Sequence, residues 1–174
     1  FVSKVIDCIL LNVSNVNYIY VVTKSNYVIR LRTELCNRDN IVVLDEDKLI
    51  DGVNFSFVKK LMNDNHWYEG YGWIYQQMLK FAFALSPYAK EYYLSWDADT
   101  LTLNKLYFFK DNKPIFTVQT EYHRLYFDTI EKLLGVGKIK PYSFIAEHMV
   151  FKTEFVKELI SEIEHCEVNG STWI

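Results

Sequence analysis

Short apolar runs alternate with helix-patterned segments along the first half of this chain. The runs 18–22, 41–44 and 91–96 are typical of buried strands. Apolar residues recur at helical spacing over 2–13, 55–62 and 72–85, with a weaker helical pattern over 26–37. This alternation predicts an α/β fold, a three-layer sandwich in which a mostly parallel, twisted sheet carries helices on both faces.

The second half of the chain predicts shorter elements. We expect a fourth strand at 115–118, a helix over 125–134 that stops at Gly135, and a stretch at 144–151 that is part strand. A last helix is expected from an N-cap at Thr153 to about residue 165. Ligands of parallel α/β sheets bind beyond the carboxyl ends of the strands, which is where Asp45 and Asp97 stand.

Size, charge and hydropathy exclude several classes of protein. A chain of 174 residues that is 50% hydrophobic predicts one domain over 1–174 with a substantial core. The excess of 22 acidic over 19 basic residues argues against a nucleic-acid partner. Apolar runs fall short of the ~18 residues that a membrane-spanning helix needs, so we expect no transmembrane segment.

The cysteines indicate a cellular compartment, and the start of the sequence indicates a longer parent chain. Cys8, Cys36 and Cys166 stand far apart, which favours free thiols in a reducing cytoplasm. The chain has no initiator Met and opens at Phe1 on a helical pattern. We therefore expect a fragment of a longer chain.

Two aspartates directly after the third predicted strand carry the main chemical signal. Asp97 and Asp99 stand two apart, and in extended chain such side chains point the same way. Two close carboxylates repel unless a cation lies between them, and Mg²⁺ or Mn²⁺ completes its shell with water and substrate phosphates. The pair therefore predicts a metal site that holds a diphosphate.

Other interpretations of this spacing stay open. Asp45 and Asp47 form a second D-x-D after an apolar run, and such a pair is also typical of a helix cap or a solvated turn. Phosphatases of the haloacid-dehalogenase type also carry two aspartates after a strand. They have Thr two residues after the second Asp, whereas here Thr100 comes one residue too early.

With these residues in view, the chain resembles a GT-A-type glycosyltransferase, and more narrowly a bacterial family of surface-polysaccharide glycosyltransferase-like proteins. The stretches that carry the resemblance are GWIYQQMLKFAFA at 72–84, YYLSWDADT at 92–100, TEYHRLYF at 120–127 and SFIAEHMVF at 143–151. The resemblance covers about 18–163. It implies a Rossmann-like nucleotide-diphospho-sugar transferase fold, here without its first strand because the chain opens on the helix that should follow it.

The resemblance implies roles for particular residues. Asp97 and Asp99 would bind Mn²⁺ or Mg²⁺ and, through it, the diphosphate of a nucleotide sugar, with UDP-sugar the commonest donor. Further contacts to this donor would come from residues of the long helix and around the two motifs: Trp73, Gln76, Lys80, Ala98 and His148. The alternative for the helix residues is a solvated face.

Acidic and histidine residues in the second half complete the predicted site. Glu147 is the candidate base that would deprotonate the acceptor hydroxyl. The alternative is a buried Glu147–His148 pair that only stabilises a turn. Glu121 and His123 are candidate contacts to a glycan acceptor, with surface polarity as the alternative.

The predicted function is thus metal-dependent sugar transfer in bacterial polysaccharide synthesis, in the cytoplasm or at the inner face of the membrane. The alternatives are a non-catalytic nucleotide-sugar or glycan-binding module and a metal-dependent phosphate hydrolase.

Overall fold

The computed structural model describes residues 1–165 as a mixed α/β protein made of two compact units. Unit 1 comprises Phe1–Ala89 and Leu101–Leu106, and unit 2 comprises Lys90–Thr100 and the residues from 107 onward. The single domain over 1–174 stays a prediction.

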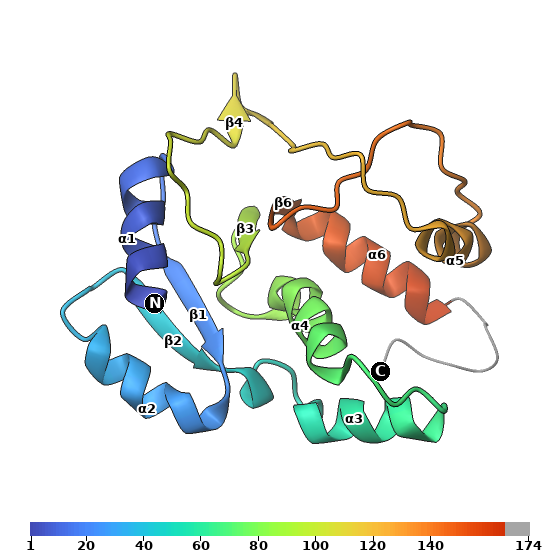
Figure 1. Cartoon of the computed structure of the whole chain (residues 1–174), viewed down its shortest axis with the longest axis horizontal. Helices are drawn as coiled ribbons and strands as arrows, with labels where there is room; N and C mark the ends of the chain where they lie inside the picture. The colour runs from blue at the N-terminus through green and yellow to red at the C-terminus, as the bar shows by residue number, and fades with distance from the viewer. Residues whose placement is uncertain (166–174) are drawn as a thin grey trace. The chain divides into compact units, whose positions relative to one another are not determined.

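Unit 1 contains the helices and strands that the sequence predicts up to residue 85 (Figure 1), with ends shifted by a few residues, and the run at 91–96 forms a strand of unit 2. They are α1 (Val2–Asn12), β1 (Ile19–Thr23), α2 (Ser25–Glu34), β2 (Ile41–Asp45), the 3₁₀ turn η1 (Glu46–Lys48), α3 (Phe55–Asp64), α4 (Tyr71–Ala82) and the 3₁₀ turn η2 (Phe83–Leu85). The weak pattern over 26–37 is thereby confirmed as a helix.

The sheet of unit 1 is a parallel pair whose two faces contact different helices. β1 and β2 run in register from Ile19 opposite Ile41 to Thr23 opposite Asp45. Val21 packs on a buried cluster that includes α1 and α2, whereas the next residue, Val22, packs on a cluster formed by α3 and α4. This alternation follows from the two-residue period of a strand.

Unit 2 is built on an antiparallel pair of strands. β3 (Tyr92–Trp96) pairs with β6 (His148–Lys152) from Tyr92 opposite Lys152 to Trp96 opposite His148. The other elements are α5 (Arg124–Leu134), α6 (Thr153–His165) and a small hairpin of β4 (Phe109–Lys110) and β5 (Lys113–Pro114). α6 follows β6 directly and buries Val156 and Ile160.

Two details of the predicted fold need correction. The strand expected at 115–118 is wrong, because the local pairing is the β4–β5 hairpin. Asp111 and Asn112 form the turn of this hairpin with φ angles of 51° and 60°, the left-handed conformation that tight hairpins require. Among the strands of the described residues only β1 and β2 pair in parallel, apart from an isolated parallel bridge between Val13 and Leu106, so the mostly parallel sheet of the prediction is limited to this pair.

Three further findings concern membrane-spanning helices and the cysteines. None of the helices within residues 1–165 is long and apolar enough to cross a bilayer. Cys8 and Cys36 are free thiols, as predicted. Cys166 lies outside the described residues.

Candidate functional site

The two aspartates of the WDADT motif lie on a tight turn at the end of β3. The Thr100 N–H donates to the Asp97 carbonyl at 3.0 Å, which closes the turn over residues 97–100. Asp97 is half-buried, while Ala98 and Asp99 are exposed at the tip. The prediction that Asp97 and Asp99 share one side of an extended chain is therefore wrong, because β3 ends at Trp96.

Glu147 lies opposite Asp97 across the strand pair. The Asp97 N–H donates to the Glu147 carbonyl at 2.8 Å, which extends the β3–β6 register by one residue pair beyond Trp96 and His148. Directly opposite residues of an antiparallel pair share a face, and like charges there are destabilising. Asp97 and Glu147 thus concentrate negative charge at this end of the strands.

The Trp96 ring connects this turn to β6. Its Nε1–H donates to the Thr100 carbonyl at 2.9 Å, and its face stacks on the His148 ring with the centroids 5.0 Å apart and an interplanar angle of 18°. The ring therefore links the loop that carries the aspartates to a fixed position on the neighbouring strand.

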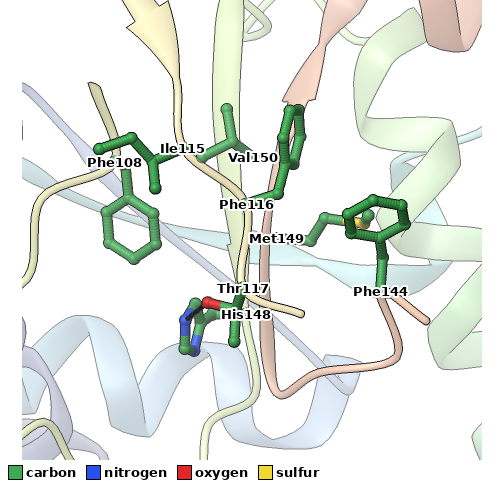
Figure 2. Close-up of a pocket in the computed structure, with 8 residues that line it drawn as sticks. All are labelled: Phe108, Ile115, Phe116, Thr117, Phe144, His148, Met149 and Val150. Atoms are coloured by element: carbon green, nitrogen blue, oxygen red, sulfur yellow. Dashed lines mark hydrogen bonds between the residues drawn. The ribbon is translucent and has the colours of Figure 1, made fainter. Parts of the chain in front are cut away.

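His148 is packed within unit 2. Its Nε2 lies 2.9 Å from the Thr117 hydroxyl, and the Phe108 ring meets it edge-on at 5.3 Å (Figure 2). Its Nδ1 is buried and has no hydrogen-bond partner among the described residues. Burial lowers the pKa of His148, against the opposing effect of the Glu147 carboxylate, so the ring favours its neutral form.

A small pocket lies beside this histidine (Figure 2). Its lining is mostly apolar and comprises Phe108, Ile115, Phe116, Thr117, Phe144, His148, Met149 and Val150. The contacts of His148 to its neighbours account for its position in this lining, and its predicted contact to a donor stays a prediction.

The residues at the turn fit a metal that takes few protein ligands. Within residues 1–165 no group of three or more His, Cys, Asp or Glu side chains is arranged to hold an ion. Mg²⁺ and Mn²⁺ are commonly held by one or two carboxylates together with water and substrate phosphates. The half-buried Asp97 and the exposed Asp99 are suited to supply these one or two carboxylates.

The helix residues predicted for the donor lie in unit 1, on α4. Trp73, Gln76 and Lys80 follow each other at helical spacings of three and four, as the sequence predicts for one stripe. Trp73 and Gln76 are exposed, and Lys80 is half-buried. Their contact to a donor stays a prediction.

Glu121 and His123 pair with each other at the start of α5. The Glu121 Oε1 and His123 Nε2 atoms lie 2.5 Å apart, and both side chains are exposed. Beside them, the Tyr122 and Phe127 rings are stacked with centroids 5.2 Å apart, and the Lys138 ammonium lies 4.2 Å from the Phe127 centroid. This surface combines ring faces with polar groups, and its role in acceptor binding stays a prediction.

The second D-x-D is a structural cap. Asp45 accepts from the Ser25 hydroxyl at 2.7 Å and from the Asp47 N–H at 3.1 Å, and the Ser25 bond lowers its pKa. Asp47 accepts from the Phe55 N–H at 2.9 Å and from the Tyr75 hydroxyl at 3.2 Å. The helix-cap interpretation is thus confirmed for this motif, because Asp45 caps η1 and bonds the start of α2, while Asp47 bonds the start of α3 and Tyr75 of α4.

Sequence reasoning missed the supporting contacts of the turn. Trp96 stands directly before the aspartates, so its place in the motif was a signal for a supporting role. Thr117 gave no signal, because its partner His148 lies 31 residues away in the chain.

Comparisons with known proteins give one match. A family model described as a family of unknown function (DUF6492) matches residues 11–174. Neither the curated proteins nor the solved structures give a match to this chain.

Proposed function

The chain belongs to DUF6492, a family whose function is open, and we propose that it is a metal-dependent glycosyltransferase of the GT-A type. It would move a sugar from a nucleotide sugar, UDP-sugar in the first instance, to a hydroxyl of a glycan in bacterial surface-polysaccharide synthesis. The three-layer GT-A sandwich and a site of action in the cytoplasm or at the inner membrane face belong to the same proposal.

The observation that carries this proposal is the acidic end of the β3–β6 pair. The tight turn after β3 carries Asp97 and Asp99, and the backbone bond from the Asp97 N–H to the Glu147 carbonyl makes Glu147 the neighbour of Asp97 across the strand pair. Carboxylates on neighbouring backbone positions attract divalent cations, and Mg²⁺ or Mn²⁺ needs only one or two of them beside water and substrate phosphates. A bound divalent ion would in turn hold the diphosphate of the donor.

Asp97 and Asp99 would hold Mn²⁺ or Mg²⁺, which supplies charge neutralisation for the departing diphosphate. Trp96, through its bond to the Thr100 carbonyl, would keep the aspartate turn in one conformation. His148 would act indirectly, since its ring faces Trp96 and Thr117.

Glu147 would act as the general base of an inverting transfer. The acceptor hydroxyl oxygen forms a bond to the anomeric carbon while the bond from that carbon to the diphosphate oxygen breaks. The electron pair of the breaking bond leaves with the diphosphate, and the hydroxyl proton passes to the Glu147 carboxylate. The exposure of Glu147 leaves it accessible to an acceptor.

A UDP-release assay with and without glycan acceptors separates this proposal from its alternatives. A transferase releases UDP faster when acceptor is present, a hydrolase is indifferent to acceptor, and a pure binding module releases none. Stimulation by acceptor is the expected result. Absence of release with every donor tested contradicts the proposed activity.

The variant Glu147→Gln tests the base. It keeps the shape of the side chain and removes its basicity, so transfer should fall by about 10²-fold or more while donor binding is unchanged. Glu162→Gln, at an exposed position on α6, is the matched control and should transfer at the normal rate. Normal turnover of Glu147→Gln, or a product of retained anomeric configuration, excludes this role for Glu147.

A further inference from the structure

The connection between α3 and α4 and the first turn of α4 expose three large aromatic side chains. Trp67, Tyr68 and Trp73 lie within seven residues and are 59%, 61% and 50% exposed. Tryptophan is highly buried on average in folded proteins, so two exposed ones in a short stretch need a reason.

The backbone that carries Trp67 is firmly held by the end of α3. The His66 N–H donates to the Asn63 carbonyl at 3.0 Å, and the Trp67 N–H donates to the Met62 carbonyl at 2.8 Å. This pair of bonds is the Schellman ending of a helix. His66 has a φ angle of 61° in the left-handed position where glycine is usual, so the chain accepts backbone strain to turn here.

The start of α4 is braced against the same helix. The Tyr71 hydroxyl donates to the Asn63 side-chain carbonyl at 2.6 Å, and the Lys59 ammonium lies 5.5 Å from the Tyr71 ring centroid. Below them, α3 and α4 share a buried cluster that includes Met62 and Tyr75. The exposed rings are therefore presented by an anchored backbone, which reduces the entropy lost on binding.

Polar groups stand close to the rings along the chain. The Tyr68 hydroxyl lies 3.1 Å from the His66 Nδ1. Gln76 follows Trp73 by three residues on α4, so its amide lies on the same helix face as the indole. Glu69 is exposed between Tyr68 and Gly70. A ring face beside carboxylate and amide groups suits a pyranose, which has an apolar C–H face and a rim of hydroxyls.

The composition of the stretch argues against other occupants. The charged side chains between residues 59 and 76 are Lys59, Lys60, Asp64 and Glu69, so the stretch has no net positive charge to attract phosphate-rich surfaces such as nucleic acids or anionic lipids. Residues 63–66 and 69 are all polar, whereas the core of a protein–protein interface is depleted of charge.

We propose that Trp67, Tyr68 and Trp73 form a carbohydrate-binding surface that recognises the faces of sugar rings in an oligosaccharide, a role that Trp73 takes in place of the predicted contact to the donor. The proposal rests on the proposed function only in its biological role, as an acceptor-binding surface, because the binding itself needs neither metal nor donor.

Fluorine NMR of the whole chain labelled with 5-fluorotryptophan tests this proposal. The chain has four tryptophans, and single Trp→Phe variants assign their signals. Cellohexaose, maltohexaose and chitohexaose are the probes, each titrated in EDTA without nucleotide. At least one probe should shift the Trp67 and Trp73 signals in a saturable manner. No shift of either signal with all three probes overturns the proposal.

Variants locate the binding surface. Trp67→Ala should weaken binding of the active probe by about tenfold, the scale of one lost aromatic contact, and Tyr68→Ala should also weaken it. Tyr27→Ala, at an exposed aromatic position on α2, is the matched control and should bind normally. Normal affinity in both Trp67→Ala and Tyr68→Ala, with normal thermal unfolding, overturns the assignment.

If an oligosaccharide binds while UDP release is absent, the binding surface stands and the transferase proposal fails. If UDP release is stimulated by acceptor while none of the probes shifts the Trp67 and Trp73 signals, the transferase proposal stands and the binding surface is excluded.

Discussion

Replacement of Trp96 by Phe is a sharp test of how the aspartate turn is held. The substitution removes the indole N–H that donates to the Thr100 carbonyl at 2.9 Å, while the smaller ring keeps part of the stack on His148. A typical hydrogen bond contributes about 1 kcal/mol, and a carbonyl left without a partner in a half-buried place adds to the cost. We therefore expect a loss of about 2 kcal/mol in the free energy of unfolding.

That loss is large enough to measure by melting. For a chain of 174 residues, each kcal/mol corresponds to about 2–4 °C, so Tm should fall by about 4–8 °C in calorimetry. Trp67→Phe is the matched control, since that ring is 59% exposed and its replacement should change Tm little. The looser turn should also bind Mn²⁺·UDP more weakly than the wild type does.

Two results would refute this reasoning. An unchanged Tm for Trp96→Phe means that the bond to Thr100 contributes nothing in solution. A lowered Tm with unchanged Mn²⁺·UDP affinity means that Trp96 supports the fold but not the conformation of the aspartate turn.

Three further substitutions test other parts of the structure. Tyr75→Phe removes the hydroxyl that donates to the Glu46 carbonyl at 2.9 Å and contacts Asp47. It should lower the free energy of unfolding by about 1–2 kcal/mol in urea. An unchanged urea midpoint would mean that the Tyr75 hydroxyl contributes nothing to stability. Burial lowers the pKa of His148, so the unfolded chain takes up its proton more readily. Stability should therefore fall as the pH drops below the ordinary value of 6.5 and less steeply in His148→Gln, whereas parallel pH profiles refute this. Asn112→Gly relieves a left-handed residue with φ of 60° and should stabilise the chain by about 0.5–1 kcal/mol, which a lower Tm would contradict.

Helices and strands were predictable where local pattern decides them. The apolar spacing of α1 and α6 and the strand-type runs of β1, β2 and β3 lie within the elements themselves, so the chain order of helices and strands follows from them. Pairing could not be predicted in the same way. β3 and β6 are antiparallel because of contacts more than fifty residues apart in the chain, which no local period encodes.

In the candidate site, too, local features were predictable and contacts between distant residues were not. The position of Asp97 at a strand end was predictable from the run before it, but its turn depends on the Thr100 N–H bond and on the Trp96 ring. The predicted strand at 115–118 had the correct apolar character, yet Thr117 serves as a partner of His148 instead. The contact of Glu147 with Asp97 joins two motifs that sequence reasoning had treated separately.

The most direct test of the central claim is calorimetry of UDP binding with and without Mn²⁺, in the wild type and in Asp97→Asn and Asp99→Asn. Asp128→Asn, at a residue of α5 that pairs with Arg124, is the matched control. The proposal predicts that Mn²⁺ and UDP each tighten binding of the other, that EDTA abolishes this coupling, and that Asp97→Asn and Asp99→Asn lose it while the control retains it. UDP affinity that is unchanged by EDTA and by both substitutions would contradict the proposal.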